Sequence, residues 1–403
     1  MASISGQNTS NIDQVDGFFT TQGGGSGITA PPVLTSGTQA AQVGSSWFNP
    51  DVTYGFFRGA ATTHKFVKMA SIHSYGQYIG IKANGELWYW ANSSTYGQAM
   101  FTTLNAWTRY GTDSDWTDVT GGQITWGFIK GGDFYFMGYG GWRMRGDGGT
   151  GTEISPTLIS SSETWEAVSM SNQTTCIRNT SGEMFFAGYN SDYGTGQGTT
   201  SGQTATFTQE QNGLTGVTHH MAGYRRCVMV RGGSIYTTGN NQNLMAGPLI
   251  ASSADINGPT LTYSGTDIVS VATFGDDATL AITTGGQIRM AGEGGQYPRP
   301  DNSNVDQKGT TGQANEAFSV LTGAGTGWTF IGGGKTASSS NWAYGIKNGE
   351  AYIGGTYTNA LGLVMGHSVG TNVWKRIGTT SNFVAIDMTG GNTNEMHCAF
   401  STS

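Results

Sequence analysis

The side chains that could do acid–base or metal chemistry are few and scattered in this sequence. His219 and His220 are adjacent, and Asp276 and Asp277 form the other dense group of titratable residues. On a β-strand the two histidines would point to opposite faces, so we do not expect them to share a metal ion. Turn chemistry explains the two aspartates. No phosphate loop, nucleophile elbow or zinc signature is present. We therefore predict no catalytic residue, metal site, cofactor or enzymatic activity.

The cysteines do not form a chemical motif either. Cys176, Cys227 and Cys398 are each expected in the strand just before the final hairpin of a repeat, at a core-facing position. No two of them have the spacing of zinc ligands, and an odd number does not suit a disulfide framework. We interpret them as small buried apolar side chains.

One segment, YGGWRMRGDGG (139–149), has the composition of a contact surface. It contains the aromatic residues Tyr139 and Trp142 and the cations Arg143 and Arg145. The Arg-Gly-Asp tripeptide inside it is ordinary turn material, and we do not interpret it as an adhesive motif. A surface loop with an exposed aromatic residue and two cations is a candidate partner contact.

The longest predicted connection, 294–327, contains two more candidate partner contacts, Tyr297 and Arg299. A connection of this length inside a compact domain is either functional or a tolerated surface insertion. Both interpretations stay open for this segment.

A repeated element must position these side chains. GELWYWANSSTYGQ (85–98) consists of a turn glycine, a run of large apolar residues and a second turn, and GEMFFAGYNSDYGTGQ (182–197) has the same form. Seven such copies can be found, and each belongs to a group of four short β-prone runs. In each group the second strand is predicted to begin near a marker residue: Val67, Trp116, Trp165, Val217, Ile268, Trp328 and Phe383.

The markers recur every 50 to 60 residues or so, which is the period of a four-stranded propeller blade. We therefore predict an all-β fold, a seven-bladed β-propeller over residues 43–403. Near the C-terminus, three β-prone runs beginning with VWKRIG (373–378) lack a fourth, and VGSSWFNPDVTYG near residue 43 is an unmatched fourth run. Joining them predicts a blade shared between the two termini, with three strands from the C-terminal end and one from the N-terminal end.

The hairpin motif resembles that of the regulator-of-chromosome-condensation family of seven-bladed propellers. TLAITTGGQIRMAG (279–292), HCAF (397–400) and the two segments quoted above carry the resemblance, in a degenerate form. The resemblance implies the propeller fold and, as a less favoured activity, nucleotide exchange on a small GTPase. Propellers host many functions, so the fold alone does not select one.

Composition limits the partners. Charged residues make up 11% of the chain, the net charge is −7, and residues before Arg58 include no Lys or Arg. Such a chain is not expected to bind nucleic acid. The N-terminus lacks a signal-peptide pattern, and no apolar run is long enough to span a bilayer. We expect a soluble protein with no membrane insertion. The adjacent Arg225 and Arg226 are expected to be a solvated turn or strand edge.

Residues 1–42 match no blade. The segment TTQGGGSGITAPPVLTSGTQ has the chemistry of a flexible linker. The stretch before it, NIDQVDGFF, supplies apolar residues suited to docking: Ile12, Val15, Phe18 and Phe19. We predict an N-terminal docking arm ahead of a rigid propeller.

The style of the sequence, low in charge and rich in Gly, Thr, Ser and Asn, is similar to that of tailed-phage appendage proteins. The leading hypothesis is a non-enzymatic virion protein, assembled in the host cytoplasm, of a tail fibre, baseplate periphery or capsid decoration. The arm would dock on other virion proteins, and a propeller rim would face a host-surface glycan or protein. The alternative is a carbohydrate-binding adhesin or lectin module.

Overall fold

The computed structural model describes the backbone of residues 65–72, 77–91, 100–102, 106–200, 202–241, 246–247, 249–250, 253–274, 278–292, 318–321, 324–333, 341–356, 374–377, 382–390 and 396–402, together with five N-terminal strands. All regular structure in these residues is β-strand apart from turns and one 3-10 residue, as the composition predicts. Residues Asp276, Asp277, Tyr297 and Arg299 lie outside the described residues.

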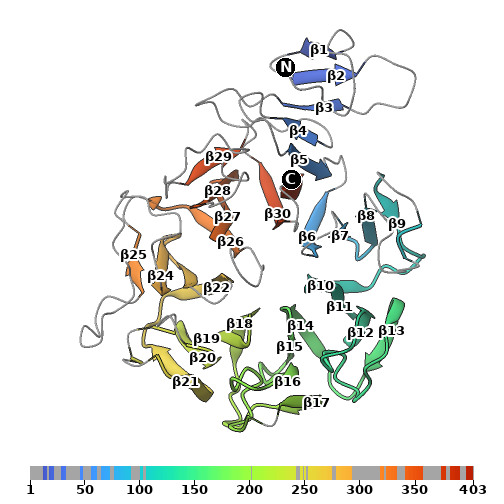
Figure 1. Ribbon diagram of the computed structural model, residues 1–403. Helices are drawn as coiled ribbons and strands as arrows, with labels where there is room; N and C mark the ends of the chain where they lie inside the picture. The colour runs from blue at the N-terminus through green and yellow to red at the C-terminus, as the bar shows by residue number, and fades with distance from the viewer. Residues whose placement is uncertain are drawn as a thin grey trace.

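Within the described residues, six blades are each built from four consecutive antiparallel strands (Figure 1). The first three blades consist of β6 (Phe66–Ser71), β7 (Gln77–Lys82), β8 (Leu87–Ala91) and β9 (Thr108–Arg109); β10 (Trp116–Gly121), β11 (Thr125–Lys130), β12 (Asp133–Gly138) and β13 (Glu153–Ser160); and β14 (Trp165–Met170), β15 (Thr174–Asn179), β16 (Met184–Tyr189) and β17 (Gln203–Gln209).

The other three blades of this kind complete the consecutive series. They consist of β18 (Val217–Gly223), β19 (Arg226–Arg231), β20 (Ser234–Gly239) and β21 (Ile256–Tyr263); β22 (Ile268–Phe274), β23 (Ala278–Thr283), β24 (Ile288–Gly292) and β25 (Ser319–Val320); and β26 (Trp328–Gly333), β27 (Asn341–Lys347), β28 (Glu350–Thr356) and β29 (Lys375–Ile377).

A further four-stranded sheet combines the two ends of the chain in the order β30 (Phe383–Gly390), β31 (Met396–Thr402), β5 (Phe56–Ala60) and β4 (Ser46–Phe48). The prediction of three C-terminal strands and one N-terminal strand was wrong, because two strands come from each end. The VWKRIG run forms β29, which pairs with β28 and so completes the preceding blade. The two halves meet where β31 pairs with β5 in parallel, with Met396 opposite Phe57.

The blade boundaries also differ from those predicted. The run TLIS was assigned to the same blade as the strand at Trp165, but it lies in β13 and pairs with β12, where Tyr135 is opposite Leu158. Six of the seven marker residues therefore start the first strand of a sheet, not the second, and Val67 is the second residue of β6, after Phe66. These first strands surround the centre of the molecule in Figure 1, and neighbouring ones such as β10 and β14 contact each other.

Each first strand has a bulge directly after its first residue. In β10 the register shifts between Trp116 and Asp118, so Thr117 has no opposite partner. The side chain of the first residue turns into the blade core and the bulged residue is exposed, as expected where one strand gains a residue. Equivalent shifts place Val67, Thr117, Glu166, Thr218, Val269, Thr329 and Val384 at this position.

The cores lie between neighbouring blades. Trp126 on β11 is fully buried and packs in one cluster with Ile79 and Ile81 of the blade before it. Because both faces of a blade are covered, its middle strands are buried along nearly their whole length, as β11 and β19 are. Apolar packing therefore holds adjacent blades together as well as filling each one.

Polar side chains complete the contacts between first strands. The backbone N–H of Ala222 donates to Ser169 Oγ at 2.7 Å, and that of Met170 donates to Thr120 Oγ1 at 3.3 Å. A first strand has no further strand on its central side, so these N–H groups need side-chain acceptors from the neighbouring blade. This role accounts for Ser and Thr at buried positions of a chain with few charges.

The N-terminal arm contains a three-stranded sheet, β1 (Ile12–Val15), β2 (Phe18–Thr21) and β3 (Thr29–Pro32). The docking candidates share the β1–β2 hairpin, where Val15 is opposite Phe18. Strand β3 falls inside the segment predicted to be a flexible linker, so that prediction was wrong for residues 29–32. Proline fits there because β3 is an edge strand of this sheet and its outer side needs no N–H donors.

Candidate functional site

The adjacent histidines have structural positions in β18. His219 Nδ1 accepts the N–H of Val271 in the next blade at 3.3 Å, whereas His220 Nε2 donates to the carbonyl of Cys176 in the previous blade at 3.3 Å. The two side chains point to opposite sides, as predicted. Burial lowers the pKa of His219 to about 4 and that of His220 to about 3, helped by nearby positive charge. Both are neutral at pH 7 and do not form a metal pair.

The cysteine prediction is confirmed for the two whose side chains are described. Cys176 and Cys227 are fully buried free thiols in one apolar cluster between neighbouring blades. Burial raises the pKa of the Cys176 thiol, and a hydrogen bond with Cys227 raises it further. A thiol in this environment is a poor nucleophile. The side chain of Cys398 lies outside the described residues.

Among the described residues, no cluster of three His, Cys, Asp or Glu side chains is suited to a metal ion. No helix in this part of the chain is long and apolar enough to cross a membrane. Arg226 is fully buried and donates to Thr279 Oγ1 at 3.1 Å and to the carbonyl of Ala278. Its prediction as a solvated residue was therefore wrong.

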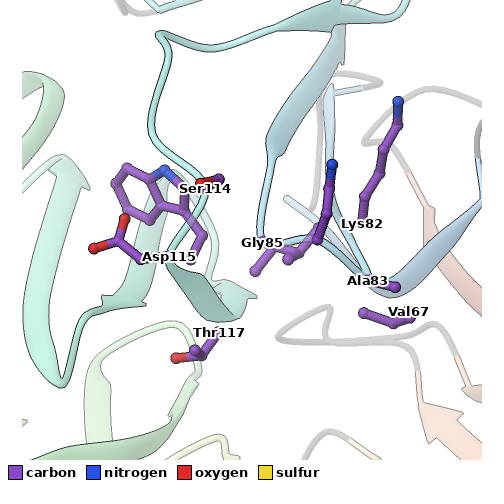
Figure 2. A pocket seen from close by; sticks show the side chains of 10 residues that line it. Val67, Lys82, Ala83, Gly85, Ser114, Asp115 and Thr117 are labelled. Carbon is purple, nitrogen blue, oxygen red and sulfur yellow. The ribbon is translucent and has the colours of Figure 1, made fainter.

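A hollow of about 410 Å³ lies between the blades of β6–β9 and β10–β13 (Figure 2). Figure 2 shows Ser114 and Asp115 on one side of it and Lys82 and Val67 on the other. The Lys82 ammonium pairs with Glu86 at 3.5 Å and lies 3.9 Å from the Trp88 ring centre, so its charge is already engaged. We therefore assign no chemistry to this hollow.

The two faces of the propeller differ in their connections. Antiparallel pairing places the loops after the first and third strands of a blade on one face, and the other connections on the opposite face. The loops after third strands include residues 139–152 and 190–202, whereas the turn between β11 and β12 contains two residues, 131 and 132. We call the first face the long-loop face; it carries the contact segment predicted from the sequence.

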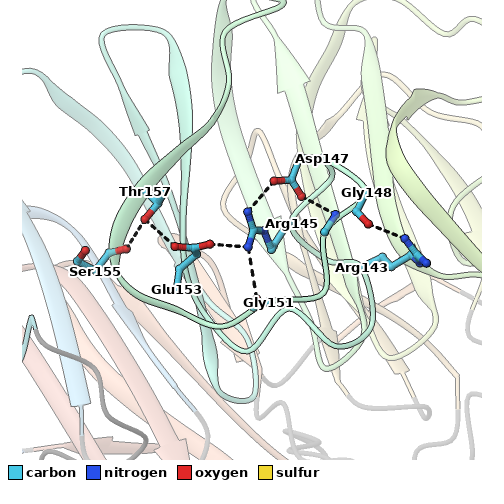
Figure 3. A network of polar contacts seen from close by, with 9 residues as sticks. Arg143, Arg145, Asp147, Gly148, Gly151, Glu153, Ser155 and Thr157 are labelled. Carbon is cyan, nitrogen blue, oxygen red and sulfur yellow. Dashed lines mark hydrogen bonds and ion pairs between the residues drawn. The ribbon is translucent and has the colours of Figure 1, made fainter.

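Two arginines organise the 139–149 segment internally (Figure 3). Arg145 pairs with Asp147 at 2.7 Å and with Glu153, and Arg143 donates to the carbonyl of Gly148 at 2.5 Å. Burial alone would raise the pKa of Asp147, but the hydrogen bonds from Arg145 and the Gly149 N–H outweigh it and the pKa lies below its usual value. The Arg and Asp side chains of the Arg-Gly-Asp tripeptide therefore pair with each other within the loop.

The aromatic residues of this segment remain accessible. Tyr139 is 46% exposed and Trp142 is 37% exposed. The Tyr139 ring covers Gly141, where a Cβ atom would lie 2.1 Å from the ring, so a side chain at position 141 would have to displace Tyr139. Of the four candidate contacts in the segment, the two aromatic side chains therefore face solvent while the two arginines hold the loop in shape.

The next blade repeats this loop with different side chains. Five residues after Gly138 and Gly188, Arg143 and Tyr193 both have a left-handed backbone, with φ of 59° and 58°. In the second loop the buried Asn190 accepts the N–H of Thr195 at 3.1 Å and donates to the carbonyl of Thr199 at 2.6 Å. The Asn of the propeller motif is therefore a loop cap in this chain.

Side chains from three consecutive blades meet on the long-loop face. The Trp142 and Tyr189 rings are 5.4 Å apart in an edge-to-face arrangement. The Arg225 guanidinium lies 5.4 Å from the Tyr189 ring centre and 4.6 Å from that of Tyr224, and pairs with Asp192 at 3.0 Å. We call Trp142, Tyr189, Asp192, Tyr224 and Arg225 the aromatic cluster.

The backbone beneath the aromatic cluster is held in an uncommon shape. Arg225, like Tyr193, is left-handed, with φ of 54°. Gly194 lies so close to Arg225 that a Cβ atom would be 2.9 Å from its carbonyl carbon, and Thr238 Oγ1 donates to the carbonyl of Tyr193 at 2.9 Å. Left-handed non-glycine residues persist where surrounding contacts enforce them, and such positions are concentrated at functional sites.

Sequence reasoning found part of this cluster. It selected Trp142, but it missed Tyr189, Asp192 and Tyr224 and interpreted Arg225 as one of a solvated pair. The available signal was the repeat, because aligning Gly138 with Gly188 places Trp142 and Asp192 at the same loop position. The contact role of all these residues stays a prediction.

Four-stranded sheets arranged around a common centre define the chain as a β-propeller. No family model matches its sequence, and no curated protein is significantly similar to it. Among solved structures, human WBSCR16 is 15% identical, with a TM-score of 0.64 over 95% of this chain and 94% of that one.

Prp20p from Saccharomyces cerevisiae is 14% identical, with a TM-score of 0.60 and 80% of each chain covered. The same yeast protein, RCC1 (Prp20) bound by Kap60, gives 14% identity and a TM-score of 0.60 over 81% of this chain and 78% of that one. The Prp20p structure was described with its binding to Gsp1p and histones. At such identities the likeness shows the fold alone: this chain has an RCC1-like propeller fold.

Proposed function

We propose that this protein is a non-enzymatic attachment protein of a tailed-phage virion, which binds the host surface through the long-loop face of its propeller. The observation that carries the proposal is the aromatic cluster, where exposed aromatic surface and charge from three blades meet on the face with the long loops. Aromatic and arginine side chains are enriched where proteins bind other molecules. The virion setting rests on the low-charge, Gly-rich style of the sequence.

The proposal assigns residues 1–42 to docking on other virion proteins, with Ile12, Val15, Phe18 and Phe19 of the β1–β2 hairpin as the candidate docking residues. It also takes the sheet of β30, β31, β5 and β4 as a seventh blade that closes the ring. Support for closure comes from β30, which contacts β6 of the first blade, and from the pairing of β31 with β5. A closed ring leaves no blade face open to solvent.

Two measurements test this function. Mass spectrometry of purified particles from the phage that encodes the chain should find it as a virion component. Labelled full-length protein should bind intact host cells saturably, and unlabelled protein should compete. Trp142→Ala should weaken cell binding, whereas Leu158→Ala, at an exposed position on the outer strand β13, should not. Absence from particles together with no saturable cell binding would exclude the proposal.

A further inference from the structure

We propose that the aromatic cluster is a binding site for an uncharged sugar, with a pyranose ring packed on Trp142 and its hydroxyl groups on Asp192 and Arg225. This inference rests on the proposed attachment function and names the ligand of the same face. It concerns a surface platform whose stacking face is the exposed side of Trp142.

Trp142 supplies the stacking surface. Its side chain is 37% exposed, and the Tyr189 ring, 5.4 Å away at 74°, supports it from one side. A pyranose has C–H groups on its faces, and these carry partial positive charge that suits the negative face of an indole. An exposed tryptophan with a fixed orientation offers this surface with little loss of side-chain freedom on binding.

Asp192 and Arg225 supply the polar contacts. Their ion pair at 3.0 Å holds both groups in place, and the partly buried Arg225 is also fixed over two tyrosine rings. A carboxylate beside a guanidinium presents acceptors and donors at close spacing, which matches neighbouring hydroxyl groups that both donate and accept.

The charge around the cluster favours an uncharged ligand. The Arg225 charge is already matched by Asp192, and Asp255 adds a second carboxylate near them. Burial raises the pKa of Asp255 and the negative charge of Asp192 acts in the same direction, whereas the Asn241 N–H and the charge of Arg225 act in the opposite direction. A sugar carboxylate or sulfate brought here would meet this negative charge, so acidic glycans are disfavoured.

The site is formed before a ligand arrives. The left-handed Tyr193 and Arg225 fix the two loops that carry Asp192 and Tyr224, and the close approach of Gly194 to Arg225 locks the loops together. Binding therefore needs no loop ordering, which would otherwise reduce the affinity.

An oligosaccharide array tests this inference with the full-length protein. The probes are neutral hexose oligomers, amino-sugar oligomers, and sialylated or sulfated oligomers. We expect retention on neutral oligomers, with Trp142→Ala reducing affinity at least tenfold and Trp142→Phe reducing it less. Asp192→Asn should also weaken binding, and Leu158→Ala should have no effect. Thermal melting of each variant shows whether the propeller is intact.

Several outcomes overturn the inference: no binding to any sugar, binding to acidic sugars alone, or unchanged binding by a folded Trp142→Ala variant. The cell assay separates these failures from failure of the proposed function. If the wild-type protein binds cells after periodate has destroyed their surface sugars, attachment holds and the sugar inference fails. If the protein binds neutral sugars but is absent from particles and does not bind cells, the sugar site is supported and the attachment function is excluded.

Discussion

The Asp118 carboxylate accepts the backbone N–H of Val168 in the neighbouring blade at 2.9 Å. The same group accepts the N–H of Val119 at 2.9 Å and the Lys68 ammonium at 2.6 Å. One buried side chain thereby joins the first strands of three consecutive blades. In a protein with so few charges, this residue has a larger role than an ordinary surface acid.

Replacing Asp118 by Ala should lower the free energy of unfolding by about 3 kcal/mol, because two buried N–H groups lose their acceptor. Lys68→Ala is the matched control: the Lys68 side chain is 45% exposed, so its ion pair should contribute less than about 1 kcal/mol. Urea unfolding of both variants measures the difference. Equal losses would show that the ion pair, not the pair of N–H acceptors, is the important contact.

The two histidines of β18 should make the propeller sensitive to acid. Their pKa values of about 4 and about 3 in the folded protein lie below the ordinary value of 6.5. The unfolded chain therefore binds more protons as the pH falls below 6.5, and stability is lost from there toward pH 4. The expected slope is about 1.4 kcal/mol per pH unit for each histidine.

Urea unfolding at pH 7.5, 6.0 and 5.0 measures this slope. The double variant His219→Gln, His220→Gln cannot take up these protons, so its stability should change less over the same range. A variant with the same slope as the wild type would place the acid sensitivity elsewhere in the chain.

Two tryptophans on strands of neighbouring blades should differ in their contribution to stability. Trp126 is fully buried between blades, so Trp126→Ala should cost about 3 to 5 kcal/mol. Trp88 is only partly buried; its ring lies under Lys82 and its Nε1 donates to Glu86 at 3.0 Å. Trp88→Ala should therefore cost about 1 kcal/mol. Denaturant unfolding tests this order, and a larger loss at Trp88 would contradict it.

Two N-terminal deletions separate the arm from the proposed seventh blade. Removing residues 1–42 should leave the melting temperature unchanged and abolish incorporation into particles. Removing residues 1–60 also takes away β4 and β5, exposes the edge of β31 and should lower the melting temperature by several degrees or more. If both deletions melt alike, the β4–β5 pair is not part of the folded ring.

The marker residues show what the sequence could predict. Trp116, Trp165 and Trp328 begin first strands and are buried. These positions could be predicted because an aromatic side chain after a turn is a strong local signal of a strand. The blade boundaries were less predictable. A run such as TLIS alternates in the same way whether it pairs with the strand before it or after it, and hydrogen bonding across a long loop decided the choice.

The aromatic cluster illustrates the same limit at the level of the site. Tyr189 and Arg225 belong to different blades, and their contact depends on how the two sheets face each other. Arg226, next in sequence, is buried because Ala278 and Thr279 accept its hydrogen bonds from the following blade. The sequence around two adjacent arginines does not indicate hydrogen-bond acceptors 52 and 53 residues away. The sequence therefore predicted a solvated pair.

The pairing of β31 with β5 sets the order of events during synthesis. Roughly 340 residues separate Ala60 from Met396, so at about 5 to 20 residues per second the β4–β5 pair waits tens of seconds for its partner strand. During this time its edge is open to any chain that has a free C-terminal hairpin. Neighbouring copies on one polysome can therefore exchange their last two strands, so that β31 of one copy pairs with β5 of another as it does within a single chain.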